Sequence, residues 1–507
     1  MDFKVINKVI AVVDTLFDGF DEQPMDSEFV LPDYCPDIAA VLKCILKPVI
    51  QSKQLSGDRI TVDGVAVIQV LYLDEARKCV RRCEFTKPFT SVFAVRSGIT
   101  SPCIWAAAKT DYVNCRATSP RRLDIHGSFN IKLRVQAESG KDVISALDGD
   151  TVHTRGTSIT YSVPAATAEK VISVSEVLDL GADVPAAVDL IRNDTVPVLT
   201  DYRIMAGKVI IKGELRVRSL YSYDTENGDT ASTRHIIPFS QIVDVDGLDE
   251  GWQCDVRLDV ISADIGISVG QNGDGRLLDV SSKISAQVQC YRTGTTEIVT
   301  DAYSTLYPLK METMPLNTSH LTDILTDTTT VREALELPSA EVASVMDMWC
   351  DAVLTGKRHE NGRTILDGRL IIFMLAKDAG GAVSFYERPS DFNVEFEDNT
   401  ENASVDINVL GVEYTTGASG LDIQTELSVT RRCYSVAAVN VVSEVAADET
   451  AAFPDQAAAL KIYFATNGES VWEVAKACHT STNAVLEENG LTGDVLSEDT
   501  MLLVPLC

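Results

Sequence analysis

The chain has 507 residues, of which 45% are hydrophobic and 23% charged, as in globular proteins that bury real cores. Its net charge of −30 argues against nucleic-acid binding, which depends on neutralising phosphates with Lys and Arg. No apolar run is long enough to span a bilayer. Asn7 and Lys8 interrupt the first apolar stretch, so we expect no secretory signal and a protein kept in the cytoplasm.

One pattern occurs three times along the chain. Each copy has a turn glycine, a strand, a second glycine and another strand, over residues 57–72, 207–221 and 362–376. Proline and phenylalanine follow the second glycine, adjacent in the first two copies and looser in the third, at Pro389 and Phe392. An alternating stretch then opens at Leu123, Leu278 and Leu421. Self-similarity on this scale indicates an array of domains.

Strand patterns dominate each copy. Within residues 214–221, Leu215, Val217 and Tyr221 alternate with polar side chains, so one face is buried and the other is wet. Turn signals with Asn-Gly favour hairpins and recur at residues 227–228, 272–273 and 361–362. We therefore predict a mainly β fold, with three repeated β-rich domains that resemble sandwiches or barrels.

One short helix is predicted before the first hairpin of each copy. Apolar residues spaced three and four apart form a single buried stripe on a helix. The three stripes are Ile38, Val41, Leu42, Ile45 and Leu46; Val184, Val188 and Ile191; and Val342, Val345, Met346 and Trp349. Each helix would plug or flank the sheet of its own copy.

Polar stretches divide the chain into four parts. We expect three repeats, over residues 1–150, 151–305 and 306–450, and a linker with a small domain over residues 451–507. The twelve cysteines do not recur at matching places in the copies. Cys79 and Cys83 have no histidine nearby to complete a zinc site. Buried, reduced thiols are the expectation.

The sequence offers little for catalysis. It contains no Walker A motif and no HExxH motif, and its six histidines are scattered singly. One Gly-x-Ser-x-Gly match, residues 266–270, is followed at once by a turn, whereas a nucleophile elbow needs a helix there. We therefore expect a protein that is not an enzyme and that has no cofactor and no metal site.

The last residues predict a small fold of a different kind. A strand over residues 461–465 precedes helices over 471–478 and 484–488, and a final strand covers 501–505, which gives the order βααβ. Ser470 and Glu473 form the S-x-x-E capping box at the start of the first helix. Asn489 and Gly490 are a good C-terminal cap for the second helix.

These pieces resemble a LysM domain. The characteristic segments are GESVWEVA at residues 468–475, NGL at 489–491 and LLVP at 502–505. The usual Pro-Gly before the last strand is replaced by residues 497–500. Residues 461–507, which we call the tail, have two lysines against seven acidic residues. The resemblance implies a groove for short glycan chains lined by Gly468, Glu469, Ser470, Asn489, Gly490, Leu491, Thr492 and Leu496. The other interpretation of Trp472 and Asn489 is that they hold the small fold together.

The repeats resemble a second family. The segment LPDYCPDI at residues 31–38, the strand over 64–72 and the pair Pro88-Phe89 are similar to the SPOCS domain of clostridial spore-coat proteins. Copies two and three lack the PDxxPDI signature. Tandem SPOCS-type domains before one LysM domain are the layout of SipL-type coat morphogenetic proteins. The resemblance implies a mother-cell protein at the forespore surface, whose tail binds the coat ATPase SpoIVA.

Three functions remain open at this point. The first is a non-enzymatic scaffold of the spore coat, in which the repeats supply length and surfaces for self-association or for other coat proteins. The second is a cell-wall protein that binds peptidoglycan or chitin oligosaccharides; the LysM likeness favours it, and the acidic tail and missing signal oppose it. The third, a wall hydrolase with a LysM targeting module, needs a catalytic domain that the sequence does not reveal.

Overall fold

The computed structural model describes residues 3–76, 79–96, 102–268, 275–336, 342–397, 402–416, 420–454 and 458–506. Most of them lie in antiparallel β-strands, which confirms the mainly β prediction. The two α-helices of the described ranges are both in the tail. One short 3-10 helix, Glu449–Ala451, precedes the tail. No helix in these ranges is both long enough and apolar enough to cross a membrane.

The first repeat consists of two antiparallel sheets that share one core. One sheet pairs β1, β2 and β6 with β7, and the other has the order β3-β4-β5. Buried side chains from both sheets form the core, among them Ile68 of β4 and Ile131 of β7. The strands are β1 (Lys4–Pro24), β2 (Ser27–Val30), β3 (Ile38–Ser56), β4 (Arg59–Asp74), β5 (Val80–Ala94), β6 (Cys103–Ser119) and β7 (Arg122–Asp148).

The other two repeats follow the same plan, and each has two three-stranded sheets. In the second repeat, β12-β13-β8 packs on β11-β10-β9, with β8 (Val152–Asp179), β9 (Asp189–Met205), β10 (Lys208–Asp224), β11 (Asp229–Asp244), β12 (Gln253–Ser268) and β13 (Leu277–Ser304). In the third, β14-β19-β18 packs on β15-β16-β17, with β14 (Leu309–Glu336), β15 (Ser344–Glu360), β16 (Arg363–Lys377), β17 (Val383–Phe396), β18 (Ala403–Thr416) and β19 (Gly420–Ala447).

The helices predicted before the hairpins are wrong, because these segments start the strands β3, β9 and β15 or lie just before them. Each of the three strands has a bulge near its beginning, where Leu42, Ile191 and Met346 have no partner in the register. A bulge adds one residue and breaks the two-residue alternation of a strand. Apolar side chains therefore return at spacings of three and four, and the pattern imitates a helix.

The bulges also explain how the repeats pack on one another. Leu42, Ile191 and Met346 all belong to one apolar cluster that draws on all three repeats. Beside this cluster, Arg192 of β9 donates to Asp347 of β15 at 2.7 Å, and both side chains are buried. The sheets β3-β4-β5, β11-β10-β9 and β15-β16-β17 thus share a core, and we call this part of the molecule the head.

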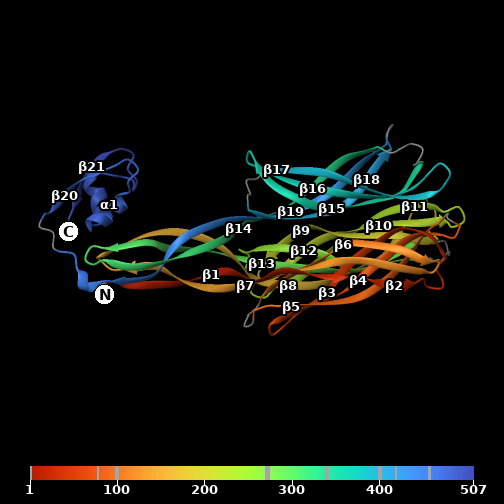
Figure 1. The fold of residues 1–507 in the computed structure, drawn as a ribbon, viewed down its shortest axis with the longest axis horizontal. Coiled ribbons are helices and arrows are strands. Elements are labelled where there is room, and N and C mark those ends of the chain that lie inside the picture. The colour runs from red at the N-terminus through yellow and green to blue at the C-terminus, as the bar shows by residue number, and fades with distance from the viewer. Residues whose placement is uncertain are drawn as a thin grey trace.

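Beyond the head, the long strand pairs β1–β7, β8–β13 and β14–β19 continue together and pack as a stalk (Figure 1). The apolar core of the stalk includes Ile10, Val143, Ile159, Ile298, Leu316 and Val441. The chain enters and leaves the repeats at the free end of this stalk, and the tail lies there too (Figure 1).

The tail has the predicted βααβ order. Its elements are β20 (Leu460–Ala465), α1 (Val471–Cys478), α2 (Thr482–Asn489) and β21 (Thr500–Pro505), and β20 pairs antiparallel with β21. The helices pack on one face of this two-stranded sheet around Val474, Val485 and Leu502, which are fully buried.

Candidate functional site

The loop before α1 and the loop before β21 form one hydrogen-bonded unit in the tail. The backbone N–H of Gly468 donates to the carbonyl of Leu496 at 2.8 Å, and the N–H of Leu496 donates to the carbonyl of Glu469 at 3.0 Å. Ser470 forms an isolated β-bridge with Val495. The side chain of Leu496 is buried in the tail core. Four of the expected groove residues therefore lie together here.

Ser470 caps α1, as predicted from the sequence. Its Oγ accepts a hydrogen bond from the backbone N–H of Trp472 at 3.1 Å. The carboxylate that completes the cap belongs to Asp494 and not to Glu473. Asp494 accepts from the Trp472 N–H at 3.0 Å and from the Ser470 hydroxyl at 3.0 Å. A negative charge at the start of a helix is favoured by the helix dipole. The Ser470 hydroxyl is therefore engaged within the tail, because it bonds both to Asp494 and to the Trp472 N–H.

The carboxylate of Glu469 closes the turn that leads into α1. It accepts from the Tyr463 hydroxyl at 2.6 Å and from the backbone N–H of Thr466 at 3.0 Å. The hydrogen bond from Tyr463, followed by those from Thr466, lowers the pKa of Glu469. The same Tyr463 contact raises the pKa of the tyrosine. Glu469 is therefore an ionised acceptor within the tail.

Asn489 lies at a different place, where it ties the end of α2 to β21. Its Nδ2 donates to the carbonyls of Val485 and Leu503 at 2.8 and 2.7 Å, and its Oδ1 accepts from the Leu503 N–H at 2.7 Å. Gly490 then adopts a φ of 60°, the left-handed conformation expected of a helix cap. These contacts hold the fold, and of the remaining groove residues Leu491 is half-buried and Thr492 is exposed.

The sheet of the tail has an exposed apolar face that the sequence did not reveal. Tyr463 and Ala465 pack into the tail core, so alternation places Ile462 and Phe464 on the opposite face. Ile462 is 55% exposed, Phe464 is 77% exposed, and Met501, the partner of Phe464 in β21, is 54% exposed. Because both faces of β20 are apolar, its periodicity could not distinguish the core side from the free side.

The helical side of the tail contacts the stalk. Tyr303 of β13 enters the tail core and donates through its hydroxyl to the carbonyl of Thr480 at 2.7 Å. The ring of Trp472 packs edge-on against Tyr303, with centroids 4.9 Å apart, and its Nε1 donates to Asp301 at 2.8 Å. Lys476 also pairs with Asp301 at 2.8 Å. Trp472 therefore serves the tail core and also joins the tail to the second repeat.

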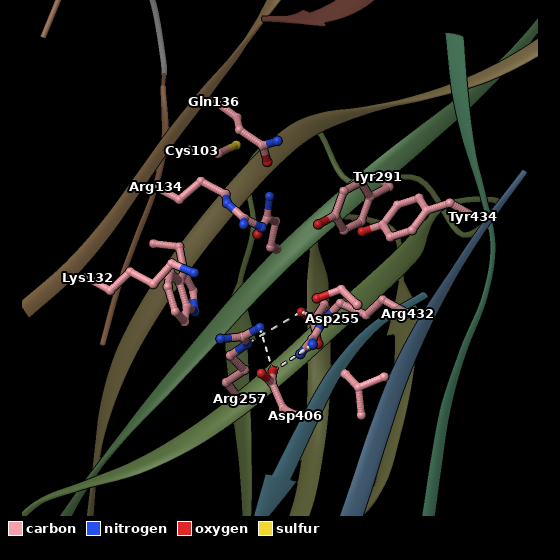
Figure 2. Close-up of a pocket in the computed structure, with 14 residues that line it drawn as sticks. Cys103, Lys132, Arg134, Gln136, Asp255, Arg257, Tyr291, Asp406, Arg432 and Tyr434 are labelled. Atoms are coloured by element: carbon pink, nitrogen blue, oxygen red, sulfur yellow. Dashed lines mark hydrogen bonds and ion pairs between the residues drawn. The ribbon is translucent and has the colours of Figure 1, made fainter. Parts of the chain in front are cut away.

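A polar pocket of about 200 Å³ lies where the three repeats meet (Figure 2). Arg134 of β7, Gln289 of β13 and Arg432 of β19 line it from equivalent positions, because each follows the repeated leucine of its copy by eleven residues. Aligning the copies on that leucine would have found these positions, although not the carboxylates that they meet.

Arg432 is the centre of an ion-pair network in this pocket. Its guanidinium donates to both carboxylate oxygens of Asp255, at 2.5 and 3.0 Å, and to Asp406 at 2.7 Å. Arg257 pairs with Asp406 at 2.9 Å and lies over the ring of Trp105. Burial alone would lower the pKa of Arg432, but the hydrogen bonds to Asp255 and the nearby carboxylates raise it. Two arginines and two aspartates thus neutralise one another, and the network joins the repeats.

Other sequence expectations concern cysteines, metals and the serine motif. The eleven cysteines of the described ranges are free, and all but the half-buried Cys115 are buried. Among the residues that the structure describes, no group of three or more His, Cys, Asp and Glu is placed to hold a metal. Ser268 is the last residue of β12, and the next two residues of the Gly-x-Ser-x-Gly match lie outside the described ranges.

Comparison with known proteins gives one family. The model of the SipL SPOCS domain matches residues 37–112 and 187–268. The two matches fall on equivalent strands: β3 to β5 and the first part of β6 in the first repeat, and β9 to β12 in the second. Neither the curated proteins nor the solved structures include a match to this chain. The first two repeats are therefore similar to SPOCS domains in tandem, which points to a protein related to sporulation.

Proposed function

We propose that the chain is a non-enzymatic scaffold of the spore coat, which binds the coat ATPase SpoIVA through its LysM-like tail. In this proposal the protein lies in the mother cell at the forespore surface, and the three β-rich repeats supply a rigid body. The two SPOCS matches support a role in the spore coat. The chemistry of the tail supports recognition of a protein.

The exposed apolar face of the tail sheet carries this proposal. All three cross-strand pairs on that face are apolar: Leu460 with Pro505, Ile462 with Leu503, and Phe464 with Met501. The stalk contacts the helical side of the tail and the loop before β21, where Arg155 pairs with Asp494 at 3.3 Å, and Ile462, Phe464 and Met501 stay exposed. Burying apolar surface stabilises a complex by about 25 cal/mol per Å², and a polar glycan offers little apolar area in return.

The alternative is binding of peptidoglycan or chitin oligosaccharides in the expected groove. Three of the expected groove residues give little support to glycan binding. The side chains of Glu469, Ser470 and Asn489 already form hydrogen bonds within the tail itself. The hydroxyl of the exposed Thr492 remains for a sugar, whereas the backbone N–H of the exposed Gly468 already donates to Leu496. The hypothesis of glycan binding predicts that the full chain sediments with purified peptidoglycan.

Retention of full-length variants on immobilised SpoIVA tests the proposal. Phe464→Ser should reduce retention at least tenfold, because interface aromatics at hot spots contribute about 2 kcal/mol or more. Phe20→Ser is the matched control, since Phe20 lies on β1 and is 69% exposed. If Phe464→Ser bound SpoIVA as tightly as the parent chain, the assignment of the tail face would be wrong. Sedimentation with peptidoglycan in place of SpoIVA binding would favour the alternative.

A further inference from the structure

A short loop in the first repeat, residues 31–37, is anchored by one arginine. It connects β2 to β3 and contains most of the LPDYCPDI segment. The guanidinium of Arg121 donates to the carbonyl of Pro32 at 2.9 Å, to the carbonyl of Cys35 at 3.1 Å and to the carboxylate of Asp37 at 2.6 Å. One side chain therefore fixes both ends of the loop.

Backbone contacts and burial hold the same loop against the turn between β6 and β7. The N–H of Leu31 donates to the carbonyl of Arg121 at 2.9 Å, and the N–H of Ile38 donates to the carbonyl of Pro120 at 2.8 Å. The side chains of Leu31 and Cys35 are buried in the core of the repeat. The backbone between them has little freedom left to lose when a partner binds.

Tyr34 extends from this fixed backbone into solvent. Its side chain is 87% exposed, more than any other large hydrophobic side chain of the described ranges. The carboxylate of the preceding Asp33 is also fully exposed, although it lies 4.0 Å from the guanidinium of Arg121. Tyrosine is enriched at the energetic centres of interfaces, because it offers a large rigid surface with one polar group. A side chain that is already positioned needs little ordering on binding.

The second repeat has the same anchored loop without the tyrosine. There Arg276 donates to the carbonyls of Gly181 and Val184 at 2.6 and 3.0 Å. Asp183 occupies the position of Tyr34, three residues after the corresponding leucine. The arginine anchor is therefore a shared feature of the two repeats, whereas the exposed ring is present only in the first of them.

We propose that Tyr34 and Asp33 form a docking site for an arginine or lysine side chain of a basic partner protein. The cation would lie over the tyrosine ring and pair with the carboxylate beside it. The net charge of −30 favours a basic surface over an acidic one, and over a second copy of this chain. β2 leads into the loop at the end of the head farthest from the tail (Figure 1). The two docking sites are thus placed to join different proteins.

Fluorine NMR of the full chain, with 3-fluorotyrosine in place of Tyr34, tests this site directly. The probe is an acetylated, amidated Gly-Arg-Gly-Arg-Gly peptide, compared with the same peptide carrying neutral citrulline. The arginine peptide should shift the resonance with a Kd about two- to fivefold lower than the citrulline peptide, the range expected of an exposed cation–π contact. Asp33→Asn should bring the Kd values of the arginine and citrulline peptides closer together.

The same label in place of Asp183 is the control, because that site shares the anchored loop and the acidic chain but not the native ring or its neighbouring Asp33. A response at position 183 equal to that at position 34 would show diffuse attraction and overturn the proposal. Equal shifts with both peptides would overturn it as well. A resonance that moves only with protein concentration would make a second copy the occupant, and would also contradict a basic partner.

Discussion

The ring of Phe89 covers the α-carbon of Gly64, directly opposite it in the antiparallel pair β4–β5. A Cβ at Gly64 would collide with this ring and with the carbonyl oxygen of Val49. The same pair recurs as Gly213 with Phe239 and as Gly368 with Phe392. The second glycine and the following phenylalanine of each copy are therefore one packing unit, in which an aromatic ring fills the space beside a glycine.

Gly213→Ala should destabilise the second repeat. Its Cβ would lie 2.6 Å from Cζ of Phe239 and 2.7 Å from the carbonyl oxygen of Val198, so the ring or the strand must shift. Overpacking of this kind costs about 1–3 kcal/mol of unfolding free energy. Urea unfolding measures the effect, with Gly266→Ala as the control because nothing lies within 4 Å of its added Cβ. Equal midpoints for both variants would refute the packing role.

These glycine pairs show what the sequence could reveal. Gly64 and the Pro88-Phe89 pair could be recognised in the sequence because equivalents occur in each copy. Their contact could not, because it depends on strand register, which the repeat pattern does not give. The helices of the tail were predicted well because their signals are local: Ser470 caps one and Gly490 ends the other.

The failures have equally definite causes. The helices predicted before the hairpins failed because bulges place Leu42, Ile191 and Met346 in the shared core of the head. The extra residue gives these strand segments the apolar spacing of a helix. The docking of the tail could not be predicted, because Trp472 and Asp301 are 171 residues apart. No local pattern connects such distant residues before the repeats have packed.

Asp301→Ala should loosen the docking of the tail on the stalk, with Tyr303 and the Arg155–Asp494 pair left in place. The carboxylate accepts from the Trp472 indole and pairs with Lys476, so its loss removes both contacts at once. Hydrogen bonds to charged groups contribute about 1.5–3 kcal/mol, so cleavage between β19 and β20 by a protease should accelerate roughly tenfold. Glu297→Ala, an exposed carboxylate on the same strand β13, should leave the cleavage rate unchanged. Tail docking through Asp301 is wrong if the two variants are cleaved alike.

Asp255→Ala should weaken the joint between the second and third repeats. It leaves Arg432 buried without its main partner, and breaking a buried pair costs about 3–5 kcal/mol. Chemical denaturation of the full chain measures this loss. Asp391→Ala removes the partner of Arg369 in an exposed pair, which should cost at most about 1 kcal/mol. Similar losses in both variants would mean that the pocket network does not hold the repeats together.

The first repeat should carry a histidine-dependent stability that declines as pH rises. The ring of His126 meets Asp26 at 2.9 Å and Asp124 at 3.1 Å. These carboxylates, Asp26 first, raise the pKa of His126 above its ordinary value. A group with a raised folded pKa stabilises the fold fully below its unfolded pKa, near 6.5 for histidine, and loses that contribution as pH rises through the folded value.

His126→Gln should therefore lower the urea midpoint at about pH 5.5 and lower it less at about pH 8.5, because the ionic contribution declines as pH rises through the raised folded pKa. His359→Gln, an exposed histidine in β15, serves as the control for the general effect of pH on the acidic chain. Because the chain carries net charge −30, the parent protein itself should gain stability towards mildly acidic pH through weaker self-repulsion. Only the difference between the variants reports on His126, and an equal loss at both pH values would assign the ring a packing role in place of an ionic one.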